Sequence, residues 1–189
     1  MLHESIQLIL EDAREHMEKT LEHLRHELST IRAGRATPAM LDSVRVEYYG
    51  THTPLNQMAS ISAPQPDLLV VQPWDRSALN EIERAIMAAN LGLNPSNDGN
   101  VIRIPVPPPS EERRRDLART ARLRGEDARI AIRNIRRHAR DEIKSVQKEE
   151  NLPEDMRYEG EEELQKLTDA YIEKVDRLLE HKEAEIMEV

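Results

Sequence analysis

The forty residues from Glu111 to Glu150 read EERRRDLARTARLRGEDARIAIRNIRRHARDEIKSVQKEE. No proline interrupts them, and the two acids at the start complement a helix dipole. At 1.5 Å per residue, one helix of this length would extend about 60 Å. Its apolar stripe, at helical spacing, consists of Leu117, Ala121, Ile132, Ile135, Ala139, Ile143 and Val146. So long a helix needs neighbours of similar length to cover that stripe.

Two other segments have the matching pattern. Residues 6–31 place apolar side chains three or four positions apart, and the segment that follows the break at Asn151, Leu152 and Pro153 does the same. Three amphipathic helices that share one core predict a three-helix bundle. The stripes are Ile6, Leu10, Ala13, Met17, Leu21, Leu24, Leu28 and Ile31 in the first segment and Leu164, Leu167, Tyr171, Val175, Leu178 and Ile186 in the last.

The sequence between the first two helices has a different character, with most of the prolines and short β-branched runs. Strands are predicted at 44–49, 55–63, 68–71 and 101–106, and a helix at 77–90 with Ser77 as its N-cap. The chain is therefore predicted to be α+β, a long three-helix bundle with a small inserted domain. We assign residues 1–30 and 107–189 to the bundle and residues 31–106 to the insert.

Two connections join the insert to the bundle, at 30–35 and at 104–107. Gly34 gives the first a helix-stopping turn, whereas Pro105 and Pro107 stiffen the second because proline fixes φ. Such a double connection can act as a hinge. We therefore expect Gly34, Pro105 and Pro107 to be hinge residues.

Composition excludes several classes of protein. The chain has no cysteine, so it can form no disulfide, no thiolate metal site and no cysteine nucleophile. Its N-terminus lacks the pattern of a signal peptide, and no apolar run approaches the roughly 20 residues of a membrane helix. We expect a soluble, cytoplasmic protein that does not contact membranes.

Charge is unevenly distributed along the chain. Residues 111–150 hold 13 Arg or Lys and 9 Asp or Glu, a balance of +4 in a chain of net charge −9, so the other 149 residues carry −13. Within this basic segment, five arginines fall at helical spacing in a band about 60° wide. This arginine stripe consists of Arg122, Arg129, Arg133, Arg136 and Arg140.

The arginine stripe has two interpretations. Charged helices commonly carry a solvated face with intrahelical ion pairs. However, residues 132–140 hold four arginines and no acid, which predicts an outward line of unneutralised guanidinium groups. Arginine suits bidentate contacts with phosphate. Because this helix lacks aromatic side chains for stacking, the pattern favours docking on the shape and phosphates of a folded RNA.

Other candidate sites give weaker signals. His16, His23 and His26 lie on the first helix, but no carboxylate is placed to complete a metal site, so we expect no metal and no cofactor. His138 and Asp141 could form an acid–base pair, yet no nucleophile accompanies them. We expect a surface pair there, and no enzymatic activity.

Eight strings in register across the whole chain resemble the ribosome recycling factor family. The resemblance implies an L-shaped two-domain protein, with the three-helix bundle as one domain and a β/α/β domain as the other, joined by two hinge segments. The strings are 29–38, 46–51, 75–77, 85–87, 90–95, 103–108, 111–114 and 131–137.

The same resemblance implies a role in translation. A family member, with elongation factor G and GTP, disassembles the post-termination ribosomal complex and binds the 23S ribosomal RNA of the large subunit through its bundle. The arginines that the family motif implies as RNA contacts are Arg133, Arg136 and Arg137. Arg129, on the same face, and Arg32 and Arg35, beside the first hinge segment, are added as further contacts. We expect a monomer.

Two alternatives stay open at the level of sequence. In the first, the chain is a helical adaptor or chaperone whose arginine stripe binds an acidic protein partner. In the second, it is an acid–base hydrolase that uses His138, which would require a concave site beside the long helix.

Overall fold

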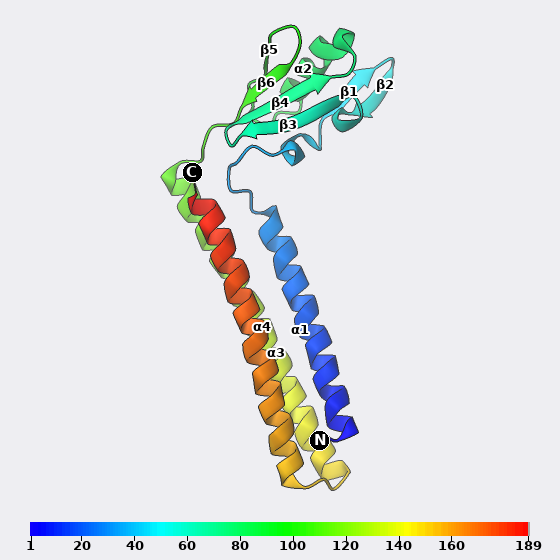
Figure 1. Ribbon diagram of the computed structural model, residues 1–189, viewed down its shortest axis with the longest axis vertical. Coiled ribbons are helices and arrows are strands. Elements are labelled where there is room, and N and C mark those ends of the chain that lie inside the picture. The colour runs from blue at the N-terminus through cyan, green and yellow to red at the C-terminus, as the bar shows by residue number, and fades with distance from the viewer. Residues whose placement is uncertain (189) are drawn as a thin grey trace. The chain divides into compact units, whose positions relative to one another are not determined.

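The computed structural model in Figure 1 describes residues 1–188, which form two compact units. One unit comprises Met1–Ala33 with Glu111–Val189, and the other comprises Gly34–Ser110. The first is a bundle of three long helices and the second contains an antiparallel sheet with one helix. The predicted fold class, a long three-helix bundle with a small inserted α+β domain, is therefore confirmed.

The bundle consists of α1 (Glu4–Thr30), α3 (Glu111–Glu149) and α4 (Glu154–Met187). The predicted break between the last two helices is confirmed. Asn151 there has a φ of +51°, in the left-handed region that asparagine tolerates, and the Leu152 N–H donates to the Gln147 carbonyl. Pro153 then precedes the first turn of α4, where its missing N–H leaves no helical hydrogen bond unmade.

The buried face of each helix differs in detail from the predicted stripes. Ile9 is buried where Leu10 was predicted, and Leu179 where Leu178 was predicted. Small residues complete the interface: a Cβ on Gly125 would lie 3.0 Å from the Leu179 Cδ2, and one on Gly160 only 2.7 Å from the Ile6 Cγ2. Large side chains from one helix thus fill the space above glycines of another.

The smaller unit contains a two-stranded sheet, a four-stranded sheet and one helix. Strands β1 (Arg45–Tyr48) and β2 (Thr51–Pro54) form a hairpin, while the larger sheet has the order β3-β4-β6-β5 with every pair antiparallel. The core lies between these strands and α2, and its fully buried side chains include Leu69, Ile82, Ile86 and Ile104. The remaining elements are β3 (Ala59–Gln65), β4 (Leu68–Pro73), α2 (Leu79–Ala88), β5 (Ser96–Asn97) and β6 (Ile102–Pro105), with 3-10 turns at Pro38–Leu41, Leu55–Gln57 and Arg76–Ala78.

Three local predictions for this unit were wrong. Leu55–Gln57 is a 3-10 turn rather than the start of a strand, and the polar strands β2 and β5 were not predicted. Ser77 is not the N-cap of α2, which begins two residues later. Instead the Asp75 Oδ1 accepts hydrogen bonds from both the N–H and the hydroxyl of Ser77, which starts a 3-10 turn ahead of the helix.

Gly34 brings the two ends of the smaller unit together. Its φ is +80°, which only glycine adopts readily, and a Cβ at this position would lie 2.5 Å from the Cδ of Pro109. The Ala36 N–H also donates to the Pro66 carbonyl, and the Val106 N–H donates to the Asp67 carbonyl. The entry and exit segments of this unit are thus bound to the same β-turn.

Candidate nucleic-acid interface

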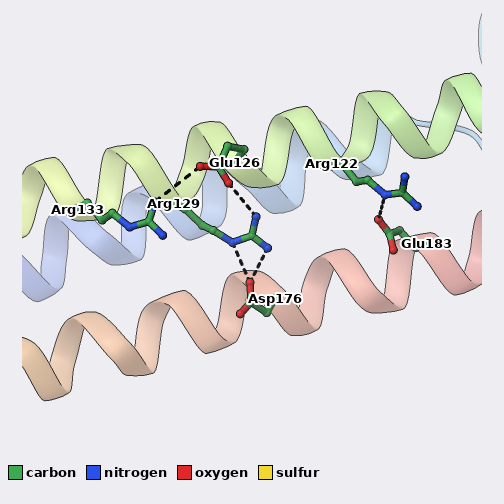
Figure 2. Close-up of polar contacts among 6 residues, drawn as sticks. All are labelled: Arg122, Glu126, Arg129, Arg133, Asp176 and Glu183. Atoms are coloured by element: carbon green, nitrogen blue, oxygen red, sulfur yellow. Dashed lines mark hydrogen bonds and ion pairs between the residues drawn. The ribbon is translucent and has the colours of Figure 1, made fainter.

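The arginine stripe of α3 lies beside α4, and acids of α4 reach toward it. The Arg122 Nε lies 2.7 Å from the Glu183 Oε1, and the Arg129 Nε and Nη2 lie 2.9 Å and 2.6 Å from the Asp176 Oδ1. Figure 2 shows these contacts between the two helices. These pairs connect the two helices at points two turns apart. The stripe therefore follows the seam between α3 and α4.

Arg129 has the most polar partners of these arginines, and only 21% of its side chain is exposed. Its Nη1 donates to the Glu126 Oε2 at 3.2 Å, so all three guanidinium nitrogens have partners. Burial is the largest single influence and lowers the pKa of the Arg129 guanidinium, but the hydrogen bonds and charges of Asp176 and Glu126 together outweigh it and leave the pKa above its usual value. Arg129 thus acts as an ionic cross-link between α3 and α4.

The other stripe arginines are also matched by acids or amides. Arg133 lies 3.7 Å from the Glu126 Oε1. Arg140 lies 3.8 Å from the Glu161 Oε1. The Arg136 Nη1 donates to the Gln165 Oε1 at 3.0 Å. The prediction of an unneutralised line of guanidinium groups was therefore wrong for Arg122, Arg129, Arg133 and Arg140, because it considered only acids near in sequence, whereas most of the partners come from α4.

A signal for this pairing is present in the sequence. Arg122, Arg129 and Arg136 recur every seven residues on α3, and α4 carries Asp169, Asp176 and Glu183 with the same step. Two antiparallel helices with opposite charges at matching steps of seven place those charges opposite each other. Matching the arginines of α3 with the acids of α4, and not only with acids of α3, would have predicted the cross-links.

Arg137 differs from its neighbours on α3. It is exposed, and within residues 1–188 no hydrogen bond or ion pair occupies its guanidinium. Positions seven and fourteen residues earlier on the helix share its face and hold Ile130 and Leu123, both exposed apolar side chains. The outward face of α3 therefore presents a free cation beside apolar surface, whereas on the face toward α4 Arg122 and Arg129 are paired with acids and Arg136 donates to a neutral amide.

The two arginines near the first connection lie outside the stripe. Arg32 is exposed just beyond the end of α1, and Arg35 is half-buried in the smaller unit. The stripe itself is built by α3 alone. Arg129, Arg133, Arg136 and Arg137 thus lie on one helix, whereas Arg32 follows α1 and Arg35 belongs to the smaller unit.

His138 does not form the predicted pair with Asp141. Its side chain is 81% exposed, and its Nε2 lies 2.8 Å from the Glu142 Oε1, one helical turn away. It borders an open groove of about 400 Å³ between α1 and α3, which His16 and Asp12 also line. None of the side chains in this groove is a serine, threonine, cysteine or lysine nucleophile. Its ionisable side chains are the imidazoles of His16 and His138 and the carboxylates of Asp12 and Glu142.

The described part of the chain also offers neither a metal site nor a membrane span. Residues 1–188 contain no cluster of three or more His, Asp or Glu side chains arranged to hold a metal ion. Over the same residues, no helix combines the length and the apolar character needed to cross a bilayer.

The sequence is similar to that of one family along nearly its whole length. Residues 24–187 match the family model described as "Ribosome recycling factor". A ribosome-recycling factor of Salinibacter ruber is 60% identical over 184 residues, which cover 97% of each chain. That of Carboxydothermus hydrogenoformans is 54% identical over 184 residues, 97% of this chain and all of the relative.

Solved structures agree with the sequence comparison. A solution structure of the ribosome recycling factor aligns over the whole of both chains with a TM-score of 0.69 and 40% identity. A second match has a TM-score of 0.60 and 50% identity over 99% of this chain and all of the other. It belongs to models for the T. thermophilus ribosome recycling factor and the E. coli elongation factor G bound to the E. coli post-termination complex.

Proposed function

The chain belongs to the ribosome recycling factor family, and from this we propose that, with elongation factor G and GTP, it disassembles the post-termination ribosomal complex. The solved relative that lies in a complex with elongation factor G and the ribosome supports this proposal. The chain would bind the post-termination complex and help to take it apart without catalysing a covalent step. The elongation factor would hydrolyse the GTP. It would act in the cytoplasm, as a monomer and without a cofactor.

We propose that the bundle binds large-subunit ribosomal RNA through the outward side of α3. Arg137 carries this proposal, because an exposed guanidinium without a partner is available for bidentate contact with phosphate. Arg133 and Arg136 would join it, since each is bound through only one of its terminal nitrogens to a single partner. Arg32 and Arg35 are proposed as further contacts. Arg129 would contribute only by exchanging its hydrogen bonds to Asp176 for phosphate.

The charge of the rest of the molecule supports a single orientation on RNA. Outside residues 111–150 the chain carries a net charge of −13, so most other surfaces would be repelled by phosphate. The acids of α4 begin immediately beside the stripe. An RNA backbone would therefore be attracted along α3 and excluded from α4.

We also propose the division of the chain into a bundle domain, 1–30 with 107–189, and an inserted domain, 31–106. Gly34, Pro105 and Pro107 would serve as hinge residues in the segments 30–35 and 104–107. The φ of +80° at Gly34 and its packing on Pro109 support a defined role for the first segment. Reorientation of the inserted domain would accompany engagement of elongation factor G.

The decisive experiment measures subunit splitting of purified post-termination complexes by light scattering, with the chain added in the presence or absence of elongation factor G and GTP. We expect splitting only when all three are present, and we expect ribosome association to weaken steeply with added salt. Splitting that does not depend on the chain would refute the proposal. A protein complex that survives nuclease, without any ribosome association, would instead support the adaptor function.

A further inference from the structure

The turn between β5 and β6 is built around one aspartate. Asp98 and Gly99 lie in this turn, and the two strands that it joins can be followed in Figure 1. The Asp98 Oδ1 accepts hydrogen bonds from the Asn100 N–H at 2.9 Å and from the Val101 N–H at 3.0 Å. The Asp98 N–H in turn donates to the Val101 carbonyl at 3.3 Å. The carboxylate therefore organises the turn by accepting from its backbone.

The backbone of the turn selects glycine at the next position. Gly99 has a φ of +90°, a conformation that residues with a side chain rarely adopt. Among the described residues, no atom lies within 4 Å of the place where a Cβ of this residue would sit, so space is not the reason. The turn thus needs the carboxylate of Asp98 and the conformational freedom of Gly99, and the two residues are adjacent.

An aspartate followed by glycine readily forms isoaspartate, because glycine has no side chain to hinder the reaction. The Gly99 nitrogen attacks the Asp98 Cγ, so that a C–N bond forms and a C–O bond breaks. The hydroxyl of the carboxylic acid leaves with the amide proton as water, which gives a succinimide. Hydrolysis at either carbonyl takes up one water and yields aspartate or isoaspartate, so no other reagent is needed. This chain contains one Asp–Gly pair.

The folded turn opposes the loss of water from Asp98. The reaction requires a protonated carboxyl group, but hydrogen bonds, that from the Val101 N–H most, hold the pKa of the Asp98 carboxyl well below its usual range. The second influence on this pKa is Arg103 of β6, whose Nη1 donates to the Asp98 Oδ2 at 2.6 Å. At neutral pH the carboxyl group is therefore ionised, and its oxygen is a poor leaving group.

The folded turn also restrains the attacking nitrogen. The Gly99 N–H donates to the Asn97 Oδ1 at 3.2 Å, which fixes the plane of this peptide group. The Asn97 side chain is itself held, because its Nδ2 donates to the Glu83 Oε2 of α2. The nitrogen must break the hydrogen bond to Asn97 before it can turn toward the Asp98 Cγ. Arg103 and Asn97 thus restrain the two reacting groups separately.

We propose that Asp98–Gly99 is a site of isoaspartate formation that the fold suppresses through Arg103 and Asn97. The site lies within the smaller unit and is independent of the ribosomal function proposed above. Isoaspartate would add one carbon atom to the backbone and move the carboxylate onto the Cα. The N–H groups of Asn100 and Val101 would then lose their acceptor, so we expect the modified chain to melt at a lower temperature than the unmodified chain.

Ageing of the full chain at 37 °C tests the site. Digestion after glutamate releases residues 84–111, in which Asp98 is the only aspartate, and the isoaspartyl peptide has the same mass but a different retention time. We expect the folded chain to react at least about tenfold more slowly than the chain unfolded in guanidinium chloride, because each unit by which the pKa is lowered reduces the protonated fraction tenfold. Equal rates in the two states would overturn the proposal, as would unfolded chain without isoaspartate.

Two variants test the two restraints. Arg103→Ala removes the side-chain donor to the carboxylate, and Asn97→Ala removes the acceptor of the Gly99 N–H. Each should accelerate the reaction of the folded chain about threefold or more, since each removes one of the hydrogen bonds that oppose it. Arg103→Lys keeps a cation and should accelerate it less. Arg84→Ala, which removes an exposed arginine of α2 paired with Glu81, is the matched control and should have no effect.

All rates are measured well below the melting temperature of each variant, so that unfolded chains do not contribute. Labelling with an isoaspartyl methyltransferase and S-adenosylmethionine gives an independent measure of the product. If Arg103→Ala and Asn97→Ala both reacted at the rate of the unchanged chain, the proposed suppression would be wrong. An acceleration by Arg84→Ala as large as that by Arg103→Ala would also overturn the proposal, because it would show a general effect of lost charge.

Discussion

Arg129 and Arg137 are eight residues apart on one helix, yet their surroundings differ in every physical respect. Arg129 is mostly buried in the α3–α4 seam and donates to Asp176 and Glu126. Arg137 is exposed on the outward face without any partner among the described residues. The comparison shows that a row of like charges on a helix can contain two classes of residue. One class holds the fold together, and the other is available to a ligand.

The largest effect is expected from removing the outward charges. In Arg133→Ala/Arg137→Ala, ribosome binding measured by pelleting should fall about a hundredfold or more, because each of the two charge-assisted hydrogen bonds to phosphate contributes roughly 1.5–3 kcal/mol. The melting temperature should barely change, since these side chains are solvated. Arg177→Ala, which removes an exposed arginine of α4 paired with Glu173, is the matched control and should retain binding. If the double variant bound ribosomes as well as the unchanged chain, the outward face of α3 would be excluded as the docking surface.

A smaller effect, on stability instead of binding, is expected from Arg129→Ala. The change breaks the cross-link to Asp176 and removes packing of the aliphatic part of the side chain, so we expect a loss of about 1 kcal/mol in the free energy of unfolding. Urea denaturation measures this directly. If Arg129→Ala instead lost binding as strongly as the Arg133→Ala/Arg137→Ala variant while keeping its stability, the distinction between the two classes would be wrong.

The smallest effect is expected from Asp176→Asn. Asp176 is half exposed, so solvent weakens its ion pair with Arg129. The free energy of unfolding should therefore fall by only about 0.5 kcal/mol. Ribosome binding should stay the same or become slightly tighter, because a negative charge beside the stripe is removed. A double-mutant cycle with Arg129→Ala then reports the coupling between the two side chains. Weaker ribosome binding by Asp176→Asn would contradict the assignment of Asp176 to the fold.

Much of the bundle could be predicted because helical periodicity is a local property. The break at Asn151–Pro153 followed from residue types alone, and each stripe identified the correct face to within one position, as Ile9 and Leu179 show. The close approach of helices at Gly125 and Gly160 could not be predicted in this way. It depends on which side chain of another helix, Leu179 or Ile6, lies opposite.

In the smaller unit, too, features that depend on contacts between residues far apart in the sequence could not be predicted. β1, β4 and β6 were predicted from their β-branched residues, whereas the exposed polar strand β2 carries no apolar alternation and exists because it pairs with β1. Asp75 starts the turn before α2 because its Oδ1 accepts from the backbone and side chain of Ser77, and its other oxygen binds Tyr48, 27 residues away. Pairing across the chain decided β2 and the contact of Asp75 with Tyr48, whereas the turn from Asp75 to Ser77 is local.

The sequence by itself determined that this chain has three amphipathic helices with an α+β insert, that its positive charge is concentrated on one helix, and that its strings match one family. Those properties depend on residue type and on spacing along one segment. Only the tertiary structure decided which arginines are neutralised. Ion pairing and burial depend on which groups contact each other in the folded chain. Arg129 contacts Asp176 of another helix, whereas Arg137 has no partner among the described residues.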